Sequence, residues 1–283
     1  MEKTNYKFNL NKLLPFGKVG MGMNLDLKNK NALVCGSTQG IGKASAMALA
    51  ELGANVTLIA RNEEKLLDVL TELPNTYQTH NYIVADFQNP KELGEKVTEH
   101  LKNIGTYHIL INNTGGPKAG PVFSADVEDF ENAFTQHLKS NHVLVQAVVP
   151  GMKESDFGRI INIISTSVKQ PLDGLGVSNT IRGAVASWSK TLANELGEYG
   201  ITVNNVLPGA TATERLAEII NNKALKTGKS VEEVSKAMKN AVPAKRFAQP
   251  GEIANAVAFL ASEAAAYING INLPVDGGRT KSL

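Results

Sequence analysis

Ala32-Leu-Val-Cys-Gly-Ser-Thr-Gln-Gly-Ile-Gly42 is the stretch of sequence from which the fold can be read. A short apolar run ends there in a glycine-rich turn, and a helical pattern begins at once and stops at Gly53. Glycine lets backbone N–H groups approach a ligand closely, and the start of a helix offers unpaired donors and partial positive charge. The stretch therefore predicts a phosphate site at the end of a strand. The apolar face of the predicted helix consists of Ile41, Ala44, Ala48 and Leu52.

The glycines of this turn, Gly36, Gly40 and Gly42, have the spacing Gly-x-x-x-Gly-x-Gly. This differs from the Gly-x-Gly-x-x-Gly of the common dinucleotide fingerprint, and a glycine-rich loop between two packed elements is the alternative. The order of strand, turn and helix is the context that such a motif requires, so we favour nucleotide binding.

The composition is that of a large α/β domain without unusual charge. The 283 residues are 42% hydrophobic and 20% charged, and the formal net charge is +2. This balance gives no electrostatic reason to expect nucleic acid or a membrane as a partner, and no apolar run approaches the roughly 18 residues of a membrane span. The single cysteine, Cys35, excludes an intrachain disulfide framework and fits a reducing compartment. We therefore expect a cytoplasmic protein, and no bound metal.

Predicted strands and helices alternate from Asn31 onward. After the first strand, strands are expected at residues 56–60, 82–85, 108–112, 159–164, 201–206 and 271–275. Helices are expected near residues 63–72, 89–102, 126–154, 178–198, 230–240 and 250–262. Runs of Val, Ile and Leu between helices indicate a parallel sheet that is covered on both faces. The predicted fold class is α/β, with a doubly wound Rossmann-like sheet of about seven strands in a single domain over residues 25–283.

Residues 1–24 differ from the rest of the chain. Their apolar pattern is interrupted by Pro15 and Gly17, which does not favour a continuous helix. We expect a flexible N-terminal extension, and a partner-binding amphipathic segment is the alternative.

Polar residues follow the strand ends, where ligands bind in parallel sheets. Arg61 comes directly after the second strand, where NAD-binding folds use an acidic residue and an arginine accommodates the 2′-phosphate of NADP. A solvated surface arginine is the alternative. Since no acid stands in Ala60-Arg61-Asn62, we predict NADP as the cofactor and consider NAD less favoured. The other strand ends carry Asp86-Phe87, Asn112–Pro117, Ser165–Ser167, Pro208–Thr213 and Asp276–Gly278.

These motifs, taken in this order, resemble the short-chain dehydrogenase/reductase family, especially its 3-oxoacyl-ACP-reductase-like members, from about residue 25 to residue 283. The resemblance implies that the glycine turn holds the pyrophosphate, that Asp86 bonds the adenine edge, and that Pro208–Thr213 contacts the nicotinamide end. Within these cofactor motifs two residues depart from the family pattern, since Thr114 replaces an alanine and Cys35 a threonine. The cofactor-binding residues expected are Gly36, Ser37, Gln39, Gly40, Ile41, Gly42, Arg61, Asp86, Phe87, Asn113, Gly115, Arg182, Pro208, Gly209, Thr211 and Thr213.

The catalytic pair of the family is altered. By resemblance, a tyrosine protonates the carbonyl oxygen as hydride arrives, a lysine four residues later lowers the tyrosine pKa and holds the ribose, and a serine positions the carbonyl. Ser165 fits the serine, but the family interval then leads to Ser178 and Arg182 in place of tyrosine and lysine. None of the six tyrosines has a lysine four residues on, so a shifted alignment does not restore the pair.

The two replacements differ in what they can still do. Arg182 keeps a charge and several donors and could hold ribose hydroxyls. Ser178 is a poor acid without the reach of tyrosine, and it could instead be the N-cap of a helix over residues 179–198. A bound water could relay the proton. His137 could also do so, since imidazole titrates near neutrality, although a buried structural histidine is the alternative. His137 aligns with the family's catalytic asparagine, with Asn141 one turn further on as a second match.

Three functions stay open on the sequence. The first is an NADP-dependent oxidoreductase acting on a small-molecule carbonyl or alcohol, with a 3-oxoacyl thioester as one candidate. The second is an NADP-binding sensor or scaffold without catalysis, and the third is a non-redox enzyme on the same fold. The intact motif Pro208–Thr213 favours the first. By resemblance we expect a homotetramer or homodimer and a substrate lid over residues 214–249. The lysines and arginines of this segment could receive an acidic carrier, but its glutamates dilute that signal, so a solvated helix face is the favoured interpretation.

Overall fold

A single parallel sheet forms the centre of the molecule. The structure is a computed structural model, and it describes residues 22–282. Of the expected extension over residues 1–24, only the last three lie within that range. Within the described residues the sheet has seven strands in the order β3-β2-β1-β4-β5-β6-β7, all parallel. The strands are β1 (Asn31–Cys35), β2 (Asn55–Ala60), β3 (Asn81–Val84), β4 (Ile109–Asn112), β5 (Gly158–Ile163), β6 (Ile201–Pro208) and β7 (Asn272–Val275).

The strand order reverses between β1 and β4, which are neighbours although two strands separate them in sequence. At such a switch point the connections leave to opposite sides of the sheet, which opens a crevice at the carboxyl ends of the strands. The predicted fold class is thereby confirmed, and this edge is where the site residues are to be sought.

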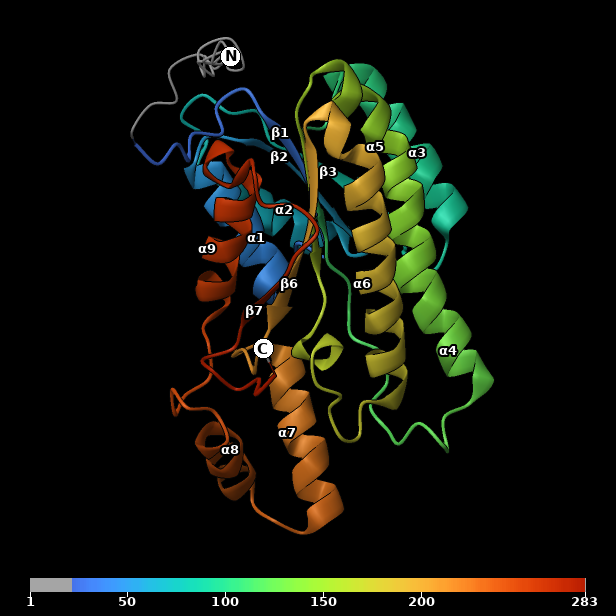
Figure 1. Cartoon of the computed structure of the whole chain (residues 1–283), viewed down its shortest axis with the longest axis vertical. Coiled ribbons are helices and arrows are strands. Elements are labelled where there is room, and N and C mark those ends of the chain that lie inside the picture. The colour runs from blue at the N-terminus through green and yellow to red at the C-terminus, as the bar shows by residue number, and fades with distance from the viewer. Residues whose placement is uncertain (1–21, 283) are drawn as a thin grey trace, which may run out of the picture.

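Helices cover both faces of the sheet (Figure 1). One face carries α1 (Gly40–Glu51), α2 (Glu63–Glu72) and α9 (Pro250–Ala261), and the other carries α3 (Pro90–Ile104), α5 (Ser140–Glu154) and α6 (Gly176–Leu196). The short α4 (Val127–Phe134) precedes α5, and α7 (Glu214–Thr227) and α8 (Val231–Asn240) lie together at one end of the molecule. None of the helices within residues 22–282 is both long enough and apolar enough to cross a bilayer.

The strands are buried on both faces, so their sequences are almost continuously apolar. In β1, Leu33 packs in the core beneath α3, α5 and α6, whereas its neighbour Val34 packs in the core beneath α1, α2 and α9. This alternation follows from the two-residue period of a strand. Cys35 is buried among these side chains, and burial raises the pKa of its thiol to about 12, so the residue acts in packing.

The expected elements are present, with three differences. The helix predicted over residues 126–154 is interrupted by a π-helical turn, Thr135–Lys139, that contains His137. Helix α6 begins at Gly176 with Leu175 as its N-cap, so the interpretation of Ser178 as N-cap is wrong. Helix α7 is absent from the expected elements, and the side chain of Thr213 accepts the N–H of Leu216 as its N-cap.

Candidate active site

The glycine turn after β1 is a closely packed structure in which larger residues do not fit. A Cβ atom on Gly42 would stand 2.1 Å from the carbonyl oxygen of Gly36, and one on Gly36 would stand 2.6 Å from that of Asn113. Asn113 also donates from Nδ2 to the carbonyl oxygens of Cys35 (3.3 Å) and Gly36 (3.2 Å). The turn after β1 is therefore fixed by the loop after β4, across the switch point.

The N-terminus of α1 fits a diphosphate. No side chain caps this helix at Gln39 and no acidic residue stands in its first turn, whereas Asn62 caps α2 and Asn89 caps α3. The first N–H groups of α1 thus keep their donors and their partial positive charge for an anion. Of the predicted phosphate-binding residues, Ser37 is buried, Ile41 packs against the core and Gln39 is exposed.

Three residues predicted for the adenosine end lie at the carboxyl ends of β2 and β3. Arg61 is exposed and makes no ion pair or hydrogen bond with the part of the chain that the structure describes. Asp86 is exposed and accepts the N–H of Gln88 at 2.9 Å. The ring of Phe87 packs in the core and its carbonyl oxygen accepts the hydroxyl of Ser140, so only its backbone faces this edge.

The loop after β6 returns toward the glycine turn. Gly209 lies so close to Asp276 that an added Cβ would be 2.7 Å from the Asp276 Cα, and Thr211 pairs with Ala248 through backbone bonds. At the start of α7, the methyl group of Thr213 is 3.2 Å from where a Cβ of Gly40 would stand. The structure thus brings the motif Pro208–Thr213 against the turn that would hold the phosphates.

Three residues predicted for the catalytic site, Ser165, Ser178 and Arg182, lie at the end of β5 and on the first turns of α6. Ser165 is half-buried at the end of β5, and its Oγ accepts the N–H of Ser167 at 3.1 Å. Ser178 is half-buried on the first turn of α6, and its side chain makes no hydrogen bond within residues 22–282. Arg182 is buried one turn later and donates from Nη1 to the carbonyl oxygen of Ile163 at 2.9 Å. Burial lowers the pKa of Arg182 to about 10, so its guanidinium stays charged at neutral pH.

His137 is buried and has a partner that sequence reasoning missed. Its Nδ1 lies 2.5 Å from the hydroxyl of Thr114, in the loop after β4. Burial, and then the charge of Arg182, lower the pKa of His137 well below its usual value, so its imidazole is neutral at pH 7. No local pattern in the sequence connects Thr114 with His137, because the two residues stand 23 positions apart. The alternative match, Asn141, is buried in α5.

Buried polar atoms without a partner gather at this edge. Among residues 22–282, they are Asn112 Oδ1, His137 Nε2, Ser167 Oγ and Arg182 Nε. Such atoms are normally paired with protein or water, so each requires an explanation. All four belong to the ends of β4 and β5 or to the helical segments that cover them, which is consistent with an edge shaped to receive a further polar group.

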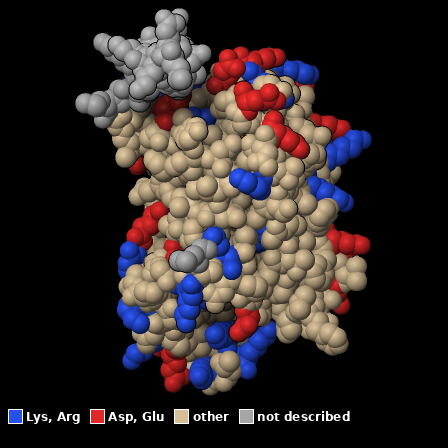
Figure 2. Space-filling view, viewed as in Figure 1, with Lys and Arg blue, Asp and Glu red and all other residues tan. Residues whose placement is uncertain are grey.

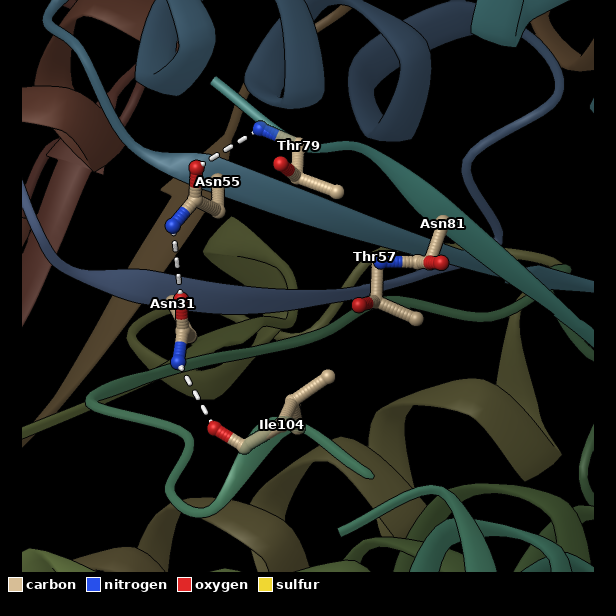
Figure 3. Close-up of a pocket in the computed structure, with 6 residues that line it drawn as sticks. All are labelled: Asn31, Asn55, Thr57, Thr79, Asn81 and Ile104. Atoms are coloured by element: carbon tan, nitrogen blue, oxygen red, sulfur yellow. Dashed lines mark hydrogen bonds between the residues drawn. The ribbon is translucent and has the colours of Figure 1, made fainter. Parts of the chain in front are cut away.

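The opposite, amino edge of the sheet holds a separate polar pocket of about 310 Å³ (Figure 3). Asn55 connects the residues that line this pocket. The Nδ2 of Asn55 donates to Asn31 Oδ1, and the Oδ1 of Asn55 accepts the N–H of Thr79, each at 2.9 Å. Asn31 in turn donates to the carbonyl oxygen of Ile104 at 3.4 Å. None of the predicted site residues lines this pocket, so it is not part of the candidate active site.

Comparison with known proteins agrees with the geometry. Residues 36–280 match the family described as Enoyl-(Acyl carrier protein) reductase. The 3-oxoacyl-[acyl-carrier-protein] reductase FabG of Staphylococcus epidermidis is 32% identical over 253 residues, which are 88% of this chain and 98% of that protein. The L-sorbose reductase of Gluconobacter frateurii, solved with NADPH and L-sorbose, has a TM-score of 0.86 and 30% identity, covering 92% of this chain and 100% of that one.

A second solved structure is the gluconate 5-dehydrogenase from Burkholderia cenocepacia J2315, in complex with NADP and tartrate. It has a TM-score of 0.83 and 29% identity, and the match covers 92% of this chain and 99% of that one. The similarities extend over nearly the whole described sheet and its helices. The chain belongs to the short-chain dehydrogenase/reductase family.

Proposed function

We propose that this protein is an NADP(H)-dependent oxidoreductase that interconverts a carbonyl and an alcohol on a small molecule. The observation that carries the proposal is the uncapped N-terminus of α1 behind the glycine turn, with the start of α7 lying against it. Arg61, exposed and without a partner among the described residues, supports NADP over NAD. Relatives named for the reduction or oxidation of sugars and sugar acids support a small polar substrate.

NADPH, when bound, supplies the hydride. The backbone N–H groups at the start of α1 bind its diphosphate, and Arg61 binds the 2′-phosphate. Ser165 donates a hydrogen bond to the substrate oxygen, because its hydroxyl stands at the end of β5 and its only described bond leaves that proton free. Arg182 places a positive charge beside the same strand end, which stabilises negative charge that develops on that oxygen. The oxygen then takes its proton from a bound water, which completes the alcohol.

We also propose that residues 25–283 act as one domain in the cytoplasm, with residues 1–24 as an extension, and that the protein assembles as a homodimer or homotetramer. The face formed by α5 and α6 supports self-association, since Trp188 is only half-buried there and donates to His142 at 3.4 Å. Sedimentation of the purified chain tests the assembly directly.

A titration followed by an activity assay tests the proposed function. NADPH and NADH are titrated by fluorescence, and absorbance is then followed with ketones, aldehydes and 3-oxoacyl thioesters. Tight NADPH binding with turnover on part of this panel is expected. Failure to bind either nucleotide would contradict the proposal outright.

The second candidate function is an NADP-binding protein without hydride transfer. Ser178 is the observation that favours it, because a serine hydroxyl cannot replace the acidity and the reach of a tyrosine. Tight NADPH binding without turnover on any substrate of the panel would support this candidate over the first.

A further inference from the structure

Arg215 links two loops that are not neighbours in the sheet. It stands in the first turn of α7, after β6, and its Nη2 donates to the carbonyl oxygen of Pro117, after β4, at 2.7 Å. Strand β5 lies between β4 and β6. The link therefore joins the loops on either side of β5, at whose carboxyl end Ser165 lies.

The guanidinium of Arg215 is held in position, and part of it remains accessible to a ligand. Its Nε lies 3.3 Å from where a Cβ of Gly116 would stand, so the missing side chain of Gly116 is what gives the group its room. The side chain of Arg215 remains 38% exposed. Its one ion pair, with Glu218 at 3.2 Å, joins it to a carboxylate that is 62% exposed, and such surface pairs are weak. An entering anion can compete for the donors of Arg215.

The cation at the end of β5 lacks a compensating carboxylate. Arg182 is buried at the end of β5 and forms no ion pair with any carboxylate in the described range. Asp276, near Gly209, has its carboxylate occupied by the N–H groups of Gly278 and Thr280. The other side chains at the strand end are neutral hydroxyls and a neutral imidazole. A buried cation that is not paired with a carboxylate, such as Arg182, favours a ligand that brings negative charge.

The outer surface of the segment over residues 214–249 carries both signs, with cations in excess. Eight lysines and arginines stand there against four glutamates, and both colours are visible at the end of the molecule that carries α7 and α8 (Figure 2). An excess of one sign at the entrance to a site raises the local concentration of oppositely charged ligands. The exposed cations of this segment are Lys223, Lys226, Lys229, Lys236, Lys239, Lys245 and Arg246.

We propose that the site selects substrates that carry a carboxylate and that Arg215 binds this carboxylate with its guanidinium. The proposal rests on the proposed function, because it concerns the substrate of the same site. Guanidinium and carboxylate are matched in geometry and charge, and an arginine held by backbone and glycine contacts is already oriented for the pair. Arg215 is thus a specificity-determining residue, whereas Ser165 donates its hydrogen bond to the substrate oxygen that reacts.

Matched pairs of probes test the proposal. D-gluconate and D-glucitol differ only in a carboxylate that replaces a terminal CH2OH group, and tartrate and threitol differ in the same way at both ends. Because these alcohols cannot react with the reduced coenzyme, their affinity for the NADPH-loaded protein is measured by calorimetry without turnover. We expect the carboxylate member of at least one pair to bind more tightly by about 10- to 100-fold, the usual range for hydrogen bonds to a charged group.

Two variants assign the effect to Arg215. Arg215→Gln should remove the preference for the carboxylate while leaving NADPH affinity unchanged. Arg246→Gln is the matched control, since Arg246 lies in the same basic segment but is paired with Glu252 at 2.6 Å, and it should keep the preference. Circular dichroism melting of each variant establishes that it is folded.

Four outcomes would overturn the inference. They are equal affinity within both pairs, no binding of any probe to a protein that holds NADPH, a preference that survives Arg215→Gln, and a large loss of NADPH affinity in that variant, which would place Arg215 on the coenzyme phosphates. A wild-type protein that fails to bind NADPH would instead contradict the proposed function itself, so the two failures are distinguishable.

Discussion

Thr114 and His137 form a contact that neither residue type suggests alone. The hydroxyl and the Nδ1 atom are 2.5 Å apart, while the Nε2 atom of His137 and the Nε atom of Arg182 are both buried without partners. In a neutral imidazole, the hydrogen bond made by one ring nitrogen fixes the tautomer, and this decides whether the other nitrogen is a donor or an acceptor. Thr114, His137 and Arg182 therefore form one buried group, and changing one of them alters the surroundings of the others.

Arg61 is the residue on which the coenzyme preference depends. Replacement by alanine removes the charged donors for the 2′-phosphate, so we expect Arg61→Ala to weaken NADPH by about 10- to 100-fold and to leave NADH nearly unchanged. Fluorescence titration of both nucleotides measures the two changes. Arg61→Lys is the control, which should lose less because it keeps the charge. Equal losses for NADPH and NADH would mean that Arg61 does not bind the 2′-phosphate.

Ser178 and Arg182 allow the catalytic question to be tested by restoring the family pair. The double variant Ser178→Tyr with Arg182→Lys introduces a phenol with an ordinary pKa of about 10 beside a cation that can lower it. We expect carbonyl reduction to rise in steady-state assays with NADPH, and the pH profile to show a new ionisation. Ser178→Phe with Arg182→Lys is the matched control, because it fills the same space without a proton.

If the double variant binds NADPH but gains no activity, restoring the family pair at positions 178 and 182 alone is not sufficient, and the other residues of the buried group also matter. The next residues to restore are then Thr114→Ala and His137→Asn, which remove the 2.5 Å contact and its buried imidazole. Activity that returns only in the fourfold variant would show that the four positions are coupled.

At the scale of elements, β1 and α1 could be predicted because their signals are local. The change from an apolar run to a helical period, with glycines between, is read within one stretch of sequence. The contact of Arg215 with Pro117 joins residues far apart in the chain, and no local pattern encodes it. For the same reason no local pattern shows that the ring of Phe87 packs in the core and that its carbonyl oxygen accepts the hydroxyl of Ser140 at the start of α5.

The glycine turn provides a prediction for the junction of β1 and α1. In Gly42→Ala the new Cβ meets the Gly36 carbonyl oxygen at 2.1 Å, which is backbone and cannot move aside cheaply. We expect a loss of about 1–3 kcal/mol in the free energy of unfolding, the usual range for overpacking, measured by urea denaturation. Gly251→Ala, in α9, has no atom within 4 Å of the new Cβ and should change stability little. Similar effects of the two variants would contradict the argument.

At the scale of the whole molecule, the histidines determine how the fold responds to acid. The pKa of His108 is lowered to about 4, first by burial and then by the charge of Lys30, and burial also lowers the pKa values of His100 and His137. The neutral His108 is needed in the fold, because its Nδ1 accepts the N–H of Asn31 at 3.1 Å and so joins the loop before β4 to the start of β1.

The sign of the pH dependence follows from these directions. Between pH 6.5 and 4 the unfolded chain binds a proton at residue 108, at an ordinary pKa of about 6.5, while the folded chain does not. Stability therefore falls as the pH is lowered through this range and is restored above it. Glu92, Glu252 and Asp276 have lowered pKa values, so their stabilising contributions are lost only as the pH falls below about 4.5, their ordinary range.

Urea denaturation at pH 7.5 and pH 5 tests the contribution of His108, because that interval lies above the range in which the carboxylates begin to be protonated. We expect the midpoint to be lower at pH 5, and His108→Gln to reduce the difference, since glutamine can accept the Asn31 N–H without binding a proton. His142→Gln, at an exposed position on α5, is the control and should keep the full difference. If His108→Gln keeps it as well, the acid sensitivity belongs to the other histidines whose pKa values burial lowers, His100 and His137.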